Sequence, residues 1–264
     1  MLLCPICQSP LTLTNKQWAC VNRHSFDVAK EGYVNLLAVQ HKRSKNPGDN
    51  TDMIQARQQF MHGGHYHFLA DAICDQLGEV NANTLLDLGC GEGYFTEAMF
   101  ASLKPAELFA IDISKAAVRL AAKRQPAINY LVASNHRIPL PEQSVDVAVR
   151  VMAPSQLSEL QRLIKPGGHL LIVRPGARHL YQLKQQIYQD VRLHDEQADE
   201  LEGFQLLEQH KVGAELTLDQ AAMGQLASMT PFAWRKTDKL KEALQSKTSF
   251  EMSTAFVLDW YQRD

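Results

Sequence analysis

Three cysteines and a histidine near the start of the chain have the spacing of metal ligands. Cys4 and Cys7 are separated by two residues, and Cys20 follows after an interval of twelve residues, with His24 close behind it. Two such pairs can close a tetrahedron of sulfur and nitrogen atoms around zinc, which leaves no open position for a catalytic water. We therefore predict a structural zinc site; the alternative is a coincidence of free side chains.

The segment between these two pairs predicts a small hairpin. Leu11 and Leu13 alternate with threonines, Asn15 and Lys16 form the turn, and Trp18 lies on the returning strand. A segment so short cannot bury enough apolar surface to fold alone. Metal binding would supply the missing stability.

A second stretch, LLDLGCGEGYF from Leu85 onward, predicts a strand, a tight turn and a helix. Its apolar run ends in Asp87, and Gly89, Gly91 and Gly93 follow before a helical pattern begins. Glycine lets a ligand approach the main chain closely, and the start of a helix offers free N–H groups. A dinucleotide fingerprint would need its last glycine one position later, and no Gly-Lys-Ser/Thr of a phosphate loop follows.

This spacing resembles motif I of the Rossmann-type S-adenosylmethionine-dependent methyltransferases. Twenty-five positions beyond Asp87, the strand-like segment ELFAID ends in Asp112, and Ser114 can cap the next helix. An acid at the tip of the second strand is where the ribose hydroxyls of a nucleoside are bound. We expect these residues to bind S-adenosylmethionine; the alternatives are a tight turn without a ligand and an unliganded surface aspartate.

Composition describes an ordinary globular protein. Of the 264 residues, 45% are hydrophobic and 21% are charged, and the length allows one large and one small domain. No apolar run suits a membrane span and no signal pattern opens the chain, so we expect a cytoplasmic protein without membrane contact. The net charge is −2, yet residues 1–60 carry seven basic and four acidic side chains. This asymmetry favours a surface for a polyanion or, equally, a solvated basic loop.

From residue 84 onward, strand-like and helix-like segments alternate, which indicates an α/β fold with a parallel, doubly wound sheet. We predict core strands at 84–88, 107–111, 128–132, 145–151 and 169–174. Helices are expected at 94–103, 114–124, 155–164 and 180–193, and upstream within 51–78, with a break at Gly63 and Gly64. Closing strands would complete a seven-stranded sheet at 204–212 and 249–260, with helical pieces near 217–227 and 237–245.

In such a fold, ligands bind beyond the carboxyl ends of the strands. After the third strand, Asn135 is placed to bond the adenine edge, and His136 or Arg137 is placed to face a substrate. The loop after the fourth strand lacks the Asn/Asp-Pro-Pro-aromatic motif of many base-methylating enzymes, which argues against methylation of an exocyclic amine. Tyr66 precedes the first core strand, where it would cover the cofactor or, more commonly for such a residue, pack in the core.

Over nearly its full length, the chain resembles the bacterial 23S rRNA guanine-N1 methyltransferases of the RlmA/RrmA group. The resemblance rests on an ordered set of segments, which are CPIC with the later cysteine and histidine, KEGYVNLL, QHKRSKNPGD, QARQQF with GHY, LLDLGCGEGYF, PGARHL and MTPFAWR. It implies a zinc-binding domain that helps to recognise an rRNA hairpin and a seven-stranded Rossmann-like methyltransferase domain. It also implies a homodimer whose cleft receives the RNA.

Carried over by position, the resemblance also assigns residues. The implied zinc ligands are Cys4, Cys7, Cys20 and His24. The residues that match cofactor-contacting segments of the family are Tyr66, Gly91, Glu92, Gly93, Tyr94 and His179. The resemblance to motif I supports cofactor contacts by Asp87 and Gly89, and the general methyltransferase fold, rather than a family-specific segment, supports those by Asp112 and Asn135.

The predicted function is S-adenosylmethionine-dependent methylation of N1 of a guanine in a hairpin loop of 23S rRNA, in its domain II. We divide the chain into a zinc-binding RNA-recognition domain at 1–35, a basic linker at 36–60 and a methyltransferase domain at 61–264. Guanine N1 loses a proton in the reaction, and the acceptor is a carboxylate, His136 or water. The rival interpretations are a small-molecule methyltransferase and a non-catalytic zinc-ribbon RNA-binding protein.

Overall fold

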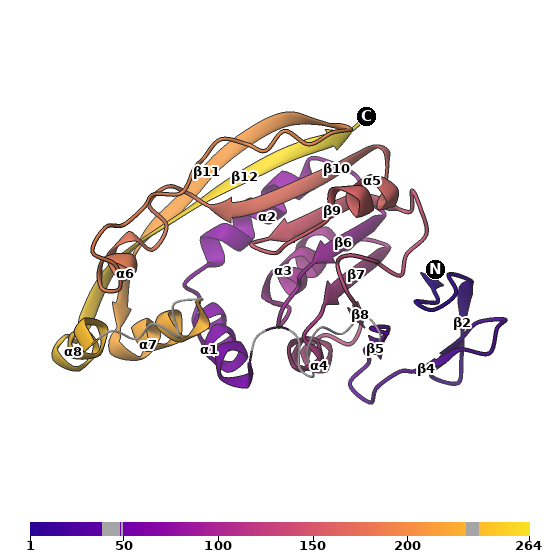
Figure 1. The fold of residues 1–264 in the computed structure, drawn as a ribbon, viewed down its shortest axis with the longest axis horizontal. Helices are drawn as coiled ribbons and strands as arrows, with labels where there is room; N and C mark the ends of the chain where they lie inside the picture. The colour runs from indigo at the N-terminus through magenta and orange to yellow at the C-terminus, as the bar shows by residue number, and fades with distance from the viewer. Residues whose placement is uncertain (39–47, 49, 231–237) are drawn as a thin grey trace.

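The computed structural model describes residues 1–38, 48, 50–230 and 238–264. In these residues, a small four-stranded sheet lies beside a large eight-stranded sheet with helices (Figure 1). The small sheet is antiparallel and contains β1 (Leu2–Leu3), β2 (Pro10–Thr14), β3 (Gln17–Ala19) and β4 (Ser25–Asp27). The predicted hairpin is β2 and β3, with Leu13 opposite Trp18. Residues 1–27 are called the N-terminal module below.

The large sheet has the strand order β11-β12-β10-β9-β6-β7-β8-β5. Its strands are β5 (Val34–Asn35), β6 (Thr84–Leu88), β7 (Glu107–Asp112), β8 (Asn129–Val132), β9 (Val145–Val151), β10 (Ile164–Pro175), β11 (Phe204–Asp219) and β12 (Ser249–Arg263). The strands from β5 to β10 pair in parallel, and β12 is antiparallel to both β10 and β11. Because β6 has β7 and β9 on either side, the chain switches direction across the sheet at β6, where α/β folds bind their ligands.

All seven predicted strands of the large sheet are present, and the sheet contains one strand more than the seven predicted. The short strand β5 pairs with β8, with Val34 opposite Leu131, and makes the sheet eight-stranded. A strand of two residues leaves no alternation in the sequence, so periodicity could not reveal it.

Eight helices lie among the described residues. They are α1 (Thr51–His62), α2 (His67–Gly78), α3 (Tyr94–Leu103), α4 (Lys115–Arg124), α5 (Leu157–Leu163), α6 (Tyr181–Gln185), α7 (Gln220–Met229) and α8 (Asp238–Ser246). Side chains of Asn50, Ser114 and Asp219 cap α1, α4 and α7 by accepting backbone N–H bonds. Helix α1 packs along α7 (Figure 1), and Gly64, with a φ of +86°, lies in the predicted break before α2.

The strands bury different residues on the two faces of the large sheet, as their two-residue period requires. On one face, Leu85 of β6 belongs to a core that includes Phe60 of α1 and Met99 of α3. On the other face, Leu86 and Leu88 belong to a core completed by α5 and the N-terminal module. The module therefore covers part of the sheet instead of lying apart from it.

Two predicted elements differ in length from those observed. The prediction of a helix at 180–193 is wrong for most of that range, because α6 spans only Tyr181–Gln185. The chain folds back after it, so that the N–H of His194 donates to the carbonyl of Ala177. Strand β11 continues seven residues past the predicted end at 212, because β12 pairs with it as far as Asp219.

Part of the predicted linker, residues 39–47 and 49, lies outside the described residues, as do residues 231–235 of the MTPFAWR segment. The linker's last residues belong to α1, and Val34 and Asn35 pair with the large sheet. The division of the chain at 35 and 60 stays a prediction. In the part of the chain that the structure describes, no helix combines the length and apolar character needed to cross a membrane.

Candidate functional site

The predicted metal ligands converge in the N-terminal module. Cys7 Sγ and Cys20 Sγ are 3.7 Å apart, and the Sγ atoms of Cys4 and Cys20 each lie 3.5 Å from His24 Nδ1. A zinc tetrahedron with Zn–S bonds of about 2.3 Å and a Zn–N bond of about 2.0 Å has edges of about 3.8 and 3.5 Å. All four ligand atoms lie within 4.8 Å of one another. The donor set and its spacing therefore fit a structural zinc ion with a closed coordination shell.

Local backbone bonds fold both halves of this cluster into tight turns. Gln8 N donates to Cys4 O, and Arg23 N donates to Cys20 O. A hydrogen bond from the Asn22 side chain, followed by bonds from Ser9, lowers the pKa of the Cys7 thiol to about 5. The thiolate is the form that binds zinc, so these neighbours prepare Cys7 as a ligand.

The glycine-rich turn between β6 and α3 depends on backbone angles that favour glycine. Gly89, Gly91 and Gly93 have φ values of +78°, +56° and +91°. A Cβ on Gly89 would lie 2.4 Å from the Cβ of Ala153, and one on Gly93 would lie 2.8 Å from the Tyr130 hydroxyl. The first and third glycines are therefore required by close packing as well as by conformation.

Asp87 ends its run on β6 as a buried carboxyl group with 2% of its surface exposed. Thr96 Oγ1, from the first turn of α3, donates a 2.6 Å hydrogen bond to its Oδ2. Burial raises the pKa of Asp87 to about 7, the Thr96 bond opposes this rise, and the nearby charge of Asp112 adds to it. The protonation state of a carboxyl group with this pKa changes readily when a cation binds beside it.

Asp112 lies at the carboxyl tip of β7, where the sequence predicts an acid. Its Oδ2 accepts a 2.9 Å bond from Gly91 N, and its Oδ1 accepts a 2.7 Å bond from Ser114 N. These bonds fix the carboxylate against the glycine-rich turn. Each carboxylate oxygen can accept more than one bond, so the hydroxyls of a ribose remain suitable partners for this group.

Glu92 and Tyr94, which the family resemblance assigns to the cofactor, have protein partners in the structure. The Glu92 carboxylate is 3% exposed and accepts a 2.9 Å bond from Arg124 Nη2, and Tyr94 Oη lies 2.6 Å from His67 Nδ1. Burial raises the pKa of Tyr94 to about 12, so its hydroxyl is neutral. At both positions a cofactor contact stays a prediction, and at Glu92 the side chain is committed to an ion pair.

The rings of Tyr66 and His179, which are far apart in the sequence, both contact the ring of Phe256. Phe256 of β12 packs edge-on against Tyr66, with ring centroids 5.2 Å apart, and lies 4.5 Å from the His179 ring. Both predicted cofactor residues are buried, at 1% and 6% exposure. Burial, followed by the charges of Lys184 and His194, lowers the pKa of His179 to about 3, so its ring is neutral.

The loop after β8 carries Asn135 and His136 to the same edge of the sheet. Asn135 Nδ2 donates a 2.9 Å bond to the carbonyl of Pro154, in the loop after β9, and it lies 4.0 Å from where a Cβ of Gly89 would be. The His136 side chain is exposed. The structure thus brings Asn135, Asp112 and the glycine-rich turn together, with His136 in the adjoining solvent-facing position.

Several residues that no sequence motif singles out hold this site in place. Arg124 of α4 bonds both the side chain and the main-chain carbonyl of Glu92, and Thr96 bonds Asp87. Arg57 Nη1, from α1, lies 4.0 Å from where a Cβ of Gly91 would be. The position of Thr96 in the first turn after a glycine-rich loop was a usable signal, whereas the other two contacts depend on tertiary packing.

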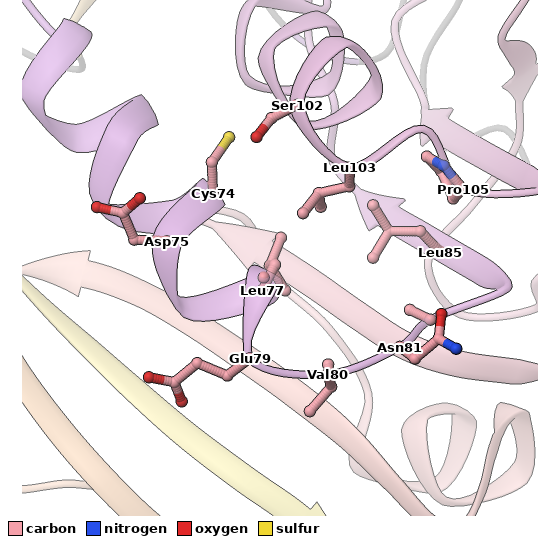
Figure 2. Close-up of a pocket in the computed structure, with 12 residues that line it drawn as sticks. Cys74, Asp75, Leu77, Glu79, Val80, Asn81, Leu85, Ser102, Leu103 and Pro105 are labelled. Carbon is pink, nitrogen blue, oxygen red and sulfur yellow. The ribbon is translucent and has the colours of Figure 1, made fainter.

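A separate surface cavity of about 600 Å³ lies at the opposite end of β6 (Figure 2). Its walls come from the ends of α2 and α3 and the start of β6, and they include Cys74, Leu77, Leu85, Ser102, Leu103 and Pro105. None of the predicted site residues lines it. Ligands of parallel sheets bind at the carboxyl ends of the strands, so this cavity is not part of the candidate site.

Known proteins match both parts of the chain. Residues 2–45 match the family model of the RlmA N-terminal zinc ribbon, and residues 86–172 match that of a methyltransferase domain. One chain in the solved structure of the complex between the Haloferax volcanii Trm112 methyltransferase activator and a methyltransferase is 18% identical. It has a TM-score of 0.50 and covers 82% of this chain and 99% of its own length, which shows a shared fold.

Two curated relatives extend over most of the chain. The 23S rRNA (guanine(748)-N(1))-methyltransferase of Streptomyces fradiae is 32% identical, over 89% of this chain and 86% of its own length. YxjB of Bacillus subtilis, which carries a provisional name as a 23S rRNA guanine-N1 methyltransferase, is also 32% identical, over 89% and 87% of the two chains. With its zinc ribbon and its S-adenosylmethionine-dependent methyltransferase domain, the chain belongs to the family of 23S rRNA (guanine-N1)-methyltransferases.

Proposed function

We propose that this protein transfers the methyl group of S-adenosylmethionine to N1 of a guanine in 23S rRNA. The single observation that carries this proposal is the similarity to the Streptomyces fradiae enzyme across both the zinc ribbon and the methyltransferase domain. The bonded arrangement of Asp112 with the glycine-rich turn supports binding of the nucleoside part of the methyl donor.

Methyl transfer from a sulfonium needs alignment of the acceptor atom with the methyl group more than it needs reactive side chains. The protein's task is to hold the guanine against the bound donor and to let the N1 proton leave. We assign proton acceptance to His136, because its ring is exposed at the edge of the site where RNA would arrive. A carboxylate and water remain the alternatives to be tested.

Four finer points belong to the same proposal. We infer that the target guanine lies in a hairpin loop in domain II of 23S rRNA and that the zinc-binding domain at 1–35 contributes to its recognition. We also infer that the active form is a homodimer, which light scattering of the purified chain would test. Because the substrate is ribosomal RNA, we expect the enzyme to act in the cytoplasm.

Primer extension across 23S rRNA tests the function directly. Methylation at guanine N1 blocks base pairing, so reverse transcription should stop at one guanine in RNA from cells with the gene and read through it without the gene. The purified chain with S-adenosylmethionine should restore the stop on unmodified RNA. Identical stops in both RNA samples would contradict the proposal and favour a small-molecule methyltransferase. Absence of donor binding in calorimetry would favour a non-catalytic RNA-binding protein.

A further inference from the structure

The N-terminal module is joined to the core of the large sheet. Leu2 and Cys4 are 2% and 0% exposed, and both belong to the same buried cluster as Ile138 and Leu140 of the loop after β8. A zinc ligand and the loop that carries Asn135 therefore share one apolar core.

The main chain of this loop is held from two sides at three consecutive carbonyl groups. Arg162 of α5 donates to Ile138 O at 2.9 Å and to Leu140 O at 2.7 Å. The carbonyl between them, Pro139 O, accepts a 2.9 Å bond from Leu3 N of β1. Helix α5 therefore holds the outer two carbonyls, and the N-terminal module holds the middle one.

The same loop is bonded to the candidate cofactor site at its other end. Ala133 N donates a 3.1 Å bond to Asp112 O at the tip of β7, and the Asn135 amide bonds Pro154 O beyond β9. A displacement at Pro139 would therefore act on residues four to six positions away that border the glycine-rich turn.

We propose that Leu3 is a positioning residue for the cofactor site, and that zinc, by holding β1 in place, fixes the loop at 133–140. This inference rests on the proposed function, because it takes that loop as one wall of the S-adenosylmethionine site. It gives the metal a role in donor binding that needs no RNA. Leu3 directly precedes the ligand Cys4, so loss of the metal releases its N–H from Pro139.

The expected rise in the Kd of the donor depends on which contacts still hold the loop after the module loosens. The module is too small to keep its fold without the metal, whereas Arg162 continues to hold two of the three carbonyls. The loop then spends part of its time in arrangements that bind the donor poorly, and the apparent Kd rises by the inverse of the competent fraction. The loss of one net backbone hydrogen bond corresponds to a rise of about three- to tenfold.

The test compares Leu3→Pro with Leu3→Ala in the full-length, zinc-loaded chain. Proline removes the N–H that bonds Pro139 and keeps all four zinc ligands, whereas alanine keeps the N–H and shortens only the side chain. Calorimetry without RNA measures the Kd of S-adenosylmethionine, metal analysis measures zinc, and hydrogen–deuterium exchange reports protection across 133–140. We expect a weaker Kd and faster exchange in the loop for Leu3→Pro alone, with an unchanged global unfolding midpoint.

Two further measurements keep the result decisive if Leu3→Pro loses zinc. The parent chain is stripped with a chelator and then reloaded, and Arg162→Gln loosens the same loop from α5 with the zinc content unchanged. We expect stripping to raise the Kd and the loop exchange, and reloading to reverse both. Unchanged loop exchange and donor affinity after stripping would overturn the inference. A zinc-loaded chain that shows this coupling but methylates no RNA would count against the proposed function alone.

Discussion

At the scale of single residues, the buried carboxyl group of Asp87 makes the stability of the free protein depend on pH. Burial raises its pKa from an ordinary value of 3.8 to about 7, so the folded protein holds a proton that the unfolded chain has released. The free energy of unfolding of the free protein therefore falls as the pH rises from 3.8 to about 7. We propose that the sulfonium of the donor binds beside Asp87, where its positive charge would stabilise the carboxylate and reverse this preference.

The Kd of S-adenosylmethionine should accordingly decrease severalfold between about pH 6 and pH 8, with a midpoint near the pKa of Asp87. S-Adenosylhomocysteine lacks the sulfonium charge and should show a weaker dependence, which makes it the control ligand. Thr96→Val removes the hydrogen bond that opposes the rise in pKa and should move the midpoint upward. Calorimetry across this pH range makes the measurement; equal pH dependence for both ligands would contradict the assignment.

His136→Ala should lower the methyl-transfer rate far more than it weakens donor binding, because we propose that this exposed ring accepts the N1 proton. Loss of a proton acceptor typically costs about 100-fold or more in rate. Single-turnover methylation of a 23S rRNA fragment measures the rate, and calorimetry measures donor binding. His136→Gln, which keeps a polar side chain, is the matched comparison. An unchanged single-turnover rate would remove His136 from the reaction.

The sequence revealed site residues wherever a local pattern fixes their position. Asp112 lies at its predicted strand tip, bonded to the glycine-rich turn, and the four metal ligands converge as their spacing predicted. The sequence could not reveal that Arg124 would form an ion pair with the carboxylate of Glu92, because the two residues lie on different elements. Contacts of this kind follow from the packing of a helix against a distant turn and carry no spacing signal.

At the scale of elements, the turn between β6 and α3 depends on the absence of side chains. Gly89→Ala should destabilise the protein by about 3 kcal/mol, since the strain of a positive φ adds to the overlap with Ala153. Gly167→Ala is the matched control, because Gly167 has a φ of +74° but no atom within 4 Å of the added Cβ. It should cost only the backbone strain of about 1 kcal/mol.

Urea unfolding measures both variants, and donor binding should weaken in Gly89→Ala alone. Equal losses in the two variants would show that backbone conformation, and not close packing against Ala153, explains the glycine.

Element lengths were predicted well where the pattern of buried residues is local, and less well elsewhere. The strand β11 is exposed along much of its length, and its partner β12, not its own apolar content, sets how far it extends. The helix predicted at 180–193 ends early because His194 returns to bond Ala177. In both cases contacts with a distant segment determine where the element ends, and the local sequence pattern does not reveal those contacts.

At the scale of the whole molecule, the N-terminal module and α5 together cover part of one face of the large sheet. Deletion of residues 1–27 should therefore expose Ile138, Leu140 and their neighbours, which are 1% exposed in the intact chain. We expect a lower urea midpoint and increased binding of an apolar fluorescent dye relative to the zinc-loaded full chain. A truncated chain with the stability of the intact protein would show that the two parts are energetically independent.

The docking of the module on a loop far along the chain also sets an order of events during synthesis. Residues 1–27 leave the ribosome early and can bind metal at once, but the segment at 138–140 that covers their apolar side appears only later. At typical elongation rates, roughly 10 s separate the two. The growing chain must therefore carry an N-terminal module with an uncovered apolar side until residues 138–140 have been synthesised, and this exposed surface favours aggregation of the nascent protein during the interval.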